Sequence, residues 1–293
     1  IEGNYNESVV IQFKSDLTLV GINDASIESD FVTIETNQTS GVTIKNLKIR
    51  GAINPWYSIN LSIENCEIFG GENGIDAFFC DECKIIENTI HDITGEVNNV
   101  GGGIYYRLSN NGLIKGNKIT NARVGCELIV SKNNTLIENK IKNMSQRGVS
   151  LLFGSNDNFV LNTKISNASW SGLSFFGSSN NSVDGLDASF ANGTPPPDQV
   201  AAGLGLIFSS NNSFINVSTM QNTNGVVLRA SSTSNLIEDL KAKNNLNYGL
   251  LIEPTADSNT IEDSEIKSNG DCDLNDQGAN NSFTNTNIGT SCN

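Results

Sequence analysis

A unit of about 22 to 24 residues recurs along most of the chain, and this repeat constrains the fold more than any other feature of the sequence. Each copy opens with Gly, alternates apolar and polar residues, passes through a Ser/Asn-rich turn and ends in an Ile-x-x-Asn-x-Ile pattern. Two steps are longer, at about 29 and 31 residues, and the last copy is degenerate, with Asp271 in the Gly position. The copies start at Gly74, Gly103, Gly125, Gly148, Gly172, Gly203, Gly225 and Gly249.

The alternation within each copy is typical of a β-strand with one buried face. We expect the residues one, three and five positions after the Gly to point inward. These are Val149, Leu151 and Phe153 in one copy, Leu173 and Phe175 in the next, and Leu204, Leu206 and Phe208 in the one after. A single copy cannot bury its own apolar face, so the copies must stack as parallel coils. Repeated Asn at one turn position can then form a ladder of amide hydrogen bonds.

The repeat predicts an all-β, single-domain parallel β-helix, a solenoid of about twelve coils over residues 1–293. Loop insertions are expected near 91–102 and 191–201, and a cap near 270–293, because terminal coils otherwise expose core and strand edges. The polar share of the sequence, with 44 Asn, 32 Ser and 19 Thr, argues against helices.

Charge and hydropathy limit the classes of partner that this chain can have. Eighteen Lys and Arg against 32 Asp and Glu give a net charge of −14, so no basic stripe is available for nucleic acid. No apolar run approaches the roughly 18 residues of a membrane span. The first residue, Ile1, suggests a processed product or a fragment.

The whole chain resembles the right-handed parallel β-helix of the pectate-lyase-like superfamily, in the Asn-rich short-repeat branch of NosD-like and archaeal surface proteins. The opening IEGNYNESVVIQFKSDLTLVGI resembles the first coil of that family. The resemblance implies the fold, whereas the scaffold hosts lyases, hydrolases, esterases, epimerases, tailspikes and inert rods. Motifs of polygalacturonases, pectin methylesterases and alginate epimerases are absent from the sequence, which favours a non-catalytic role.

The vertical register of successive copies brings one set of polar residues together. The outward positions two and four after the Gly place Asp76, Tyr105, Arg107 and Glu127 on one face, within about 5 to 10 Å of one another. A catalytic interpretation gives Asp76 and Glu127 proton transfer or Ca²⁺ binding, Arg107 the neutralisation of a uronate or the role of base, and Tyr105 the stacking of a sugar. The other interpretation is a solvated face with one Arg between two carboxylates. No cofactor or other metal is expected.

The loop at 91–102 holds His91, Asp92 and Glu96 beside this face. His91 is the only His, so we expect a surface or capping role. In later copies the fourth outward position is apolar, and we expect an assembly face of Ile129, Leu152, Phe176 and Ile207. The insertion with Pro195–Pro197, a second subunit or a carbohydrate could cover it.

Two cysteine pairs are expected to form disulfides, Cys80 with Cys83 across a turn and Cys272 with Cys292 over the open end of the core. Half a zinc site is the alternative at Cys80 and Cys83. Eleven Asn-x-Ser/Thr sequons are candidate glycosylation sites, although chance alone gives roughly eight. They begin at Asn6, Asn37, Asn60, Asn133, Asn143, Asn167, Asn180, Asn192, Asn211, Asn216 and Asn280.

Two functions remain open. One is an extracellular cell-surface glycoprotein of structural role, in an S-layer, sheath, filament or adhesive stalk, with self-association, other surface proteins or glycans as partners. The alternative is a polysaccharide lyase or glycoside hydrolase acting on acidic glycans through Asp76, Arg107 and Glu127.

Overall fold

The computed structural model describes residues 1–95 and 100–292, and every regular element in them is a β-strand. Glu96, expected beside the candidate site, lies outside the described residues. The chain forms two compact units, Ile1–Ile141 and Lys142–Asn293, so a single domain stays a prediction. None of the described elements is a helix with the length and apolarity of a membrane span.

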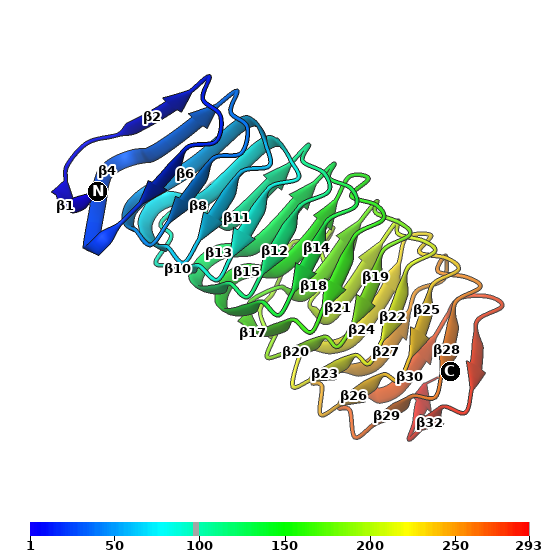
Figure 1. Cartoon of the computed structure of the whole chain (residues 1–293). Coiled ribbons are helices and arrows are strands. Elements are labelled where there is room, and N and C mark those ends of the chain that lie inside the picture. The colour runs from blue at the N-terminus through cyan, green and yellow to red at the C-terminus, as the bar shows by residue number, and fades with distance from the viewer. Residues whose placement is uncertain (96–99, 293) are drawn as a thin grey trace. The chain divides into compact units, whose positions relative to one another are not determined.

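The first unit is a stack of parallel strands in three ladders, as the blue to green part of Figure 1 shows. Ladder 1 holds short strands: β3 (Thr18–Val20), β5 (Thr43–Lys45), β7 (Ser62–Glu64), β9 (Lys84–Ile86), β12 (Leu113–Lys115) and β14 (Thr135–Ile137). Long strands bend through ladders 2 and 3: β4 (Ile22–Asn37), β6 (Lys48–Ile59), β8 (Glu67–Asp81) and β13 (Lys118–Ile129). Separate strands complete ladder 2, namely β1 (Glu2–Tyr5) and β10 (Thr89–His91), and ladder 3, namely β2 (Val9–Gln12) and β11 (Gly102–Arg107).

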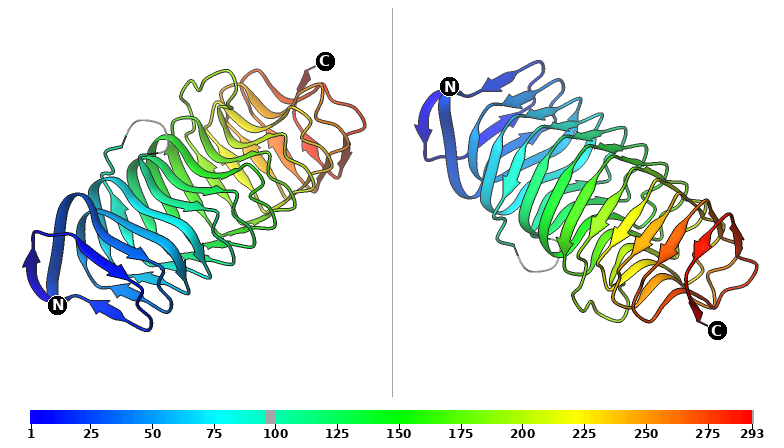
Figure 2. Two further views of the ribbon diagram at one scale, coloured as in Figure 1. Left: turned by 90° about the horizontal axis from the view of Figure 1, so that it is seen from above. Right: turned by 90° about the horizontal axis from the view of Figure 1, so that it is seen from below.

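The second unit repeats the three ladders with shorter strands, and its successive coils stack in parallel (Figure 2). Ladder 1 is β16 (Phe159–Leu161), β19 (Ser182–Asp184), β22 (Ser213–Ile215), β25 (Leu236–Glu238), β28 (Thr260–Glu262) and β31 (Ser282–Thr284). Ladder 2 is β17 (Lys164–Ala168), β20 (Asp187–Ser189), β23 (Ser218–Met220), β26 (Lys241–Lys243), β29 (Glu265–Lys267) and β32 (Asn287–Ile288). Ladder 3 is β15 (Lys140–Leu152, of which residues 142–152 belong to this unit), β18 (Ser171–Phe176), β21 (Ala202–Ile207), β24 (Asn224–Arg229), β27 (Tyr248–Ile252), β30 (Cys272–Asp276) and β33 (Ser291–Cys292).

The predicted vertical register is confirmed. Leu151 pairs with Phe175, and Phe175 with Leu206, and all three side chains are fully buried. Apolar side chains from successive coils therefore form one continuous row inside the second unit. With about six coils in each unit, the all-β solenoid of about twelve coils is confirmed.

The expectation that the fifth residue after the Gly points inward is wrong for both phenylalanines at that position. Phe153 and Phe208 are 59% and 56% exposed, with φ values of 55° and 51°. The chain enters the left-handed region at this corner, which ends the alternation of the strand and turns the side chain outward. Phe175, three residues after its Gly and inside the strand, is buried as expected.

Asparagine ladders hold the corners together, as predicted. In the second unit, amide hydrogen bonds of 3.0–3.1 Å link Asn158, Asn181, Asn212, Asn235, Asn259 and Asn281 in sequence. Each inner Asn also satisfies a backbone carbonyl of the corner, as Asn212 does for Ser178 at 3.2 Å. Because these polar groups are buried, the ladder supplies the hydrogen bonds that water cannot.

The last repeat is shifted from its predicted register. Tyr248 pairs with Cys272 and Leu250 with Leu274, so Asp273, and not Asp271, occupies the position of the Gly. The register follows the apolar Leu274, which takes the inward position and is 8% exposed.

Candidate functional site

The outward face of ladder 3 in the first unit brings four predicted residues into register. Tyr105 pairs with Asp76 on one side and with Glu127 on the other, and Arg107 pairs with Phe78 and Ile129. The three strands β8, β11 and β13 therefore carry the predicted set on adjacent coils, about 4.8 Å apart.

Asp76 and Arg107 form the polar centre of this face. Arg107 Nε lies 3.3 Å from Asp76 Oδ1, and both side chains are largely buried, at 16% and 23% exposed. Asn73 donates to the other carboxylate oxygen at 3.4 Å. Burial raises the pKa of Asp76, and the positive charge of Arg107 lowers it by less, so the pKa stays above its ordinary value. A carboxyl with a raised pKa is a stronger base than an ordinary Asp and can also carry a proton.

Tyr105 and Glu127 are not available to a ligand. Tyr105 is fully buried, with the Arg107 guanidinium 4.4 Å from its ring centroid, and Arg123 Nη2 donates to its hydroxyl at 2.7 Å. The hydroxyl in turn donates to the Val100 carbonyl at 3.3 Å, so the end of the inserted loop packs against it. The expectation that Tyr105 stacks a sugar is therefore wrong. Glu127 is only 5% exposed and supports the face from within.

Aromatic residues that the sequence prediction missed supply the stacking surface. A cleft of about 310 Å³ is lined by Trp56, Tyr57 and Phe78 together with Asp76 and Arg107. Phe78 contacts the Tyr57 ring at 5.9 Å, and Trp56 pairs with Phe78 across the ladder. The sequence contained the information needed to predict this surface, because Trp56 and Phe78 hold the fourth outward position of their coils.

The aromatic surface of this cleft continues at the neighbouring corner. The Tyr57 ring stacks on Phe79 at 5.2 Å, and these side chains are 51% and 41% exposed. The register of β6 and β8 also places Asn54 beside Asp76, and its Oδ1 is buried with no hydrogen-bond partner among the described residues. A buried acceptor without a partner next to an open cleft is a place where a ligand hydroxyl can donate.

The residues do not fit a Ca²⁺ site. The strand carrying Tyr105 separates Asp76 from Glu127. Within residues 1–95 and 100–292, no three His, Cys, Asp or Glu side chains are grouped so that they could hold a metal ion.

His91 is partly exposed and contacts neighbouring side chains, which agrees with the surface alternative of its expected surface or capping role. Its ring contacts Asp92 Oδ2 at 2.8 Å and Glu67 Oε1 at 3.2 Å, and stacks on Phe69 at 5.4 Å. These partners occupy both ring nitrogens and one ring face.

The residues of the expected assembly face belong to both units. Ile129 is partly exposed in the first unit. In the second, Leu152, Phe176 and Ile207 are in register, but Ile207 is covered by Val200 of the proline-containing insertion. Self-coverage, one of the expected alternatives, therefore accounts for Ile207. Exposed Phe153 and Phe208 flank Phe176 at 5.4 and 5.8 Å and extend the apolar strip instead.

Both predicted disulfides are present. Cys80 bonds to Cys83, and Cys272 bonds to Cys292 near the end of the second unit. The half-zinc alternative at Cys80 and Cys83 is thereby excluded. Cys66 and Cys126 are buried free thiols, and burial raises the pKa of Cys66 to about 11.

Four of the eleven sequons arise from the corner itself. In each Asn-Asn-Ser/Thr copy the first Asn is exposed at positive φ, and the Ser or Thr starts a strand of ladder 1. The second Asn is buried in the first three copies and partly buried in the last. These copies begin at Asn133, Asn180, Asn211 and Asn280. Turn geometry therefore explains these motifs without glycosylation.

Comparisons with known proteins place this geometry in a family. The family model described as right handed beta helix region matches residues 1–140, 32–188 and 139–288. The chain belongs to the right-handed β-helix family. No curated protein matches the sequence.

Solved structures share the fold at low identity. The A-module of mannuronan C-5 epimerase AlgE4 from Azotobacter vinelandii is 12% identical, with TM-score 0.68, over 96% of this chain and 84% of that one. The periplasmic alginate epimerase AlgG is 13% identical, with TM-score 0.64, over 94% and 78%. The GH87 α-1,3-glucanase from Streptomyces thermodiastaticus is 12% identical, with TM-score 0.70, over 96% and 64%. All three are carbohydrate-active proteins, and the likeness concerns the fold.

Proposed function

We propose that this β-helix protein binds an acidic polysaccharide in the cleft of Trp56, Tyr57, Asp76, Phe78 and Arg107 and acts on it by elimination. The observation that carries the proposal is the Asp76–Arg107 ion pair at the base of an aromatic cleft. Aromatic faces suit the apolar faces of sugar rings, and a guanidinium suits a carboxylate. The alginate epimerases named above act on an acidic polysaccharide, which supports the same substrate class.

The chemistry follows from having one carboxylate in the cleft. Two-carboxylate glycoside hydrolysis needs a second accessible acid, and Glu127 is buried. In the elimination, Arg107 pairs with the uronate carboxylate and makes the C5 proton more acidic. The Asp76 carboxylate takes that proton, the C4–O bond breaks, a C4=C5 double bond forms, and the same proton passes to the leaving oxygen.

Two readouts test this step separately from binding. Incubation with alginate or polygalacturonate should raise the ultraviolet absorbance of the unsaturated uronate, and a polymer deuterated at C5 should react more slowly because its C5–D bond breaks in this step. Asp76→Asn should lower turnover by about 10²-fold or more while binding persists. Arg107→Ala should weaken both. Asp239→Asn, which removes an equal charge at an exposed position, should leave both unchanged. Absence of new ultraviolet absorbance on every uronate polymer would contradict the proposal.

An extracellular or periplasmic setting fits the two disulfides, because these bonds persist in oxidising compartments. Membership of the Asn-rich surface-protein branch and glycosylation of the sequons stay predictions. Peptide mapping of the protein from its native cells would report the occupancy of each sequon.

The exposed aromatic strip favours a second role in self-association. Phe153 and Phe208 expose large apolar faces on the second unit. If copies pack through this strip, sedimentation should show association that a Phe153→Ser, Phe208→Ser variant loses, whereas Phe159→Ser should retain it. Monomers at high concentration would contradict this role.

A further inference from the structure

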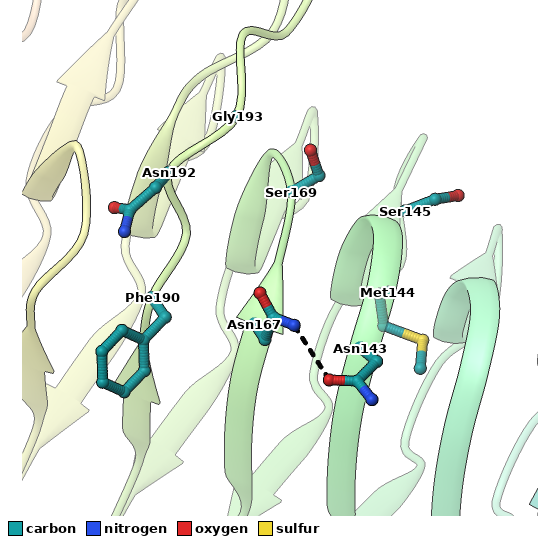
Figure 3. A pocket seen from close by; sticks show the side chains of 8 residues that line it. All are labelled: Asn143, Met144, Ser145, Asn167, Ser169, Phe190, Asn192 and Gly193. Atoms are coloured by element: carbon teal, nitrogen blue, oxygen red, sulfur yellow. Dashed lines mark hydrogen bonds between the residues drawn. The ribbon is translucent and has the colours of Figure 1, made fainter.

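A second pocket lies wholly in the second unit and has a different chemistry from the acidic-glycan cleft. It has a volume of about 620 Å³. Figure 3 shows its lining from successive coils, with Asn143, Asn167 and Phe190 at the corners and Ser145, Ser169 and Asn192 above them in this view. Met144 and Gly193 complete the lining, and none of the eight residues carries an ionisable side chain. In a chain with a net charge of −14, a pocket of this size without charged lining favours a neutral polar ligand.

The insertion between β20 and β21 builds one wall of the pocket. The equivalent corner between β23 and β24 needs only residues 221–223, whereas this connection runs through residues 190–201. Figure 2 shows it as a yellow-green loop standing out from the strands. A stable solenoid does not require the extra length, and long ordered connections are usually functional.

The wall is fixed at both ends. Gly193 N donates to the Ser169 carbonyl at 2.6 Å, and a Cβ at Gly193 would lie 2.1 Å from Ser169 Oγ. Near the other end, Arg147 Nη2 donates to Gln199 Oε1 at 2.6 Å while its guanidinium lies 5.1 Å from the Trp170 ring centroid. A pocket held in this way loses little entropy when a ligand binds.

Phe190 differs from the polar residues that hold the same corner in the neighbouring coils. It occupies the corner where the neighbouring coils carry Asn167 and Gln221, has φ of 62° and is 45% exposed. The left-handed region is unfavourable for a bulky residue, and an exposed ring adds little to the core. An exposed aromatic ring beside amides and hydroxyls is the combination that stacks a sugar ring and bonds its hydroxyls.

We infer that this pocket binds a neutral saccharide, with Phe190 stacking the ring and the Asn143, Asn167 and Ser169 side chains bonding its hydroxyls. Asn167 Nδ2 already donates to Asn143 Oδ1 at 2.9 Å, which orients the two amides (Figure 3). The saccharide has two possible sources. It is either a free oligosaccharide or a glycan on the protein's own Asn143, Asn167 or Asn192, which all begin sequons.

The test uses the full chain made in a host without N-glycosylation. Maltohexaose, cellohexaose, mannohexaose and chitohexaose are titrated by calorimetry. At least one should bind, and Phe190→Ala should weaken that binding by about three- to tenfold. Gly193→Val, which displaces the wall, should weaken it further. Phe159→Ala, an exposed Phe outside the pocket, and Asp76→Asn, in the other cleft, should bind as the parent does.

A second arm separates the two sources. Protein from a glycosylating host is mapped for sugars at Asn143, Asn167 and Asn192 and titrated again. Loss of free-oligosaccharide binding together with occupied sequons identifies an attached glycan as the occupant, whereas retained binding identifies a free saccharide. If none of the four probes binds the unglycosylated protein, or if Phe159→Ala weakens binding as much as Phe190→Ala, the inference is overturned. The acidic-glycan cleft is unaffected by either result.

Discussion

Asn269 donates its side-chain amide to Oδ1 of Asp273 at 2.7 Å, and this bond ends the amide ladder that runs through Asn222 and Asn245. An asparagine accepts from one coil and donates to the next, whereas a carboxylate only accepts. Asp273 therefore takes donors from both sides, including the Thr290 backbone N–H at 2.7 Å. The ladder is closed at the last coil by the chemistry of its final member.

Replacing Asp273 with Asn should destabilise the second unit by about 1.5–3 kcal/mol at neutral pH, because hydrogen bonds to a charged acceptor are lost and an amide donor meets the Thr290 N–H. Burial alone would raise the pKa of Asp273, but the hydrogen bonds from Asn269 and Thr290 outweigh it and hold the pKa below its ordinary value of 3.8.

The stability that the Asp273 carboxylate contributes should depend on pH. A carboxyl with a lowered folded-state pKa stabilises the fold above its unfolded-state pKa, and this contribution is lost as pH falls through the folded-state value. The difference between parent and Asp273→Asn in urea unfolding should therefore shrink below about pH 4. A difference that stays constant at low pH would contradict this role.

Removing one inner member of an asparagine ladder should cost more than removing its neighbour on the corner. Asn212→Ala leaves the buried Asn181 amide and the Ser178 carbonyl without their partner, for an expected loss of about 3 kcal/mol. Asn211→Gly is the matched control, because Asn211 is exposed at φ 56° and Gly adopts that conformation without strain. If chemical unfolding shows that both variants lose the same free energy of unfolding, the ladder makes no specific contribution to stability.

The titration of Asp76 should depend on Arg107. The guanidinium lowers a pKa that burial raises, so Arg107→Ala should move the Asp76 pKa further up. Carboxyl NMR signals report this directly, without a substrate. If Asp76 is the base, the turnover of a polyuronate should rise with pH through the same value, and the rise should move to higher pH in any Arg107 variant that retains turnover. An unchanged Asp76 signal in Arg107→Ala would argue against their coupling.

The two disulfides should differ in their effect on unfolding. The chain-entropy relation gives about 3 kcal/mol for the 20-residue separation of Cys272 and Cys292 and about 2 kcal/mol for the 3-residue separation of Cys80 and Cys83. Double Cys→Ser variants of each pair, compared by chemical unfolding under oxidising conditions, check this order. A larger loss from the Cys80–Cys83 pair would indicate that the bond acts on the native corner instead.

The sequence predicted most of what depends on periodicity. Stacking forces equal positions of successive copies into register, so the buried row through Leu151 and the pairing of Asp76, Tyr105 and Glu127 could be read from spacing. The prediction from periodicity was wrong where a corner ends the alternation of inward and outward side chains, as at Phe153. It was also wrong in the degenerate last repeat, where two registers were possible and Asp273 takes the position of the Gly.

The chemistry of the candidate site was harder to predict for a different reason. Tyr105 is covered by the end of an inserted loop, and loop paths are not set by the repeat. Trp56 and Tyr57 come from a coil that precedes the first Gly-started copy at Gly74, so their place beside Asp76 was not predicted. The pocket wall at Gly193 likewise depends on an insertion whose course periodicity does not determine.

The corner made of Asn-Asn-Ser/Thr has an evolutionary consequence. Its first Asn is held outward by the same geometry that buries the second. Lengthening such a protein by duplicating a coil copies a potential sugar acceptor along with the turn. In a secretory compartment, carbohydrate density along that edge would then grow in proportion to coil number, before selection had acted on any sugar.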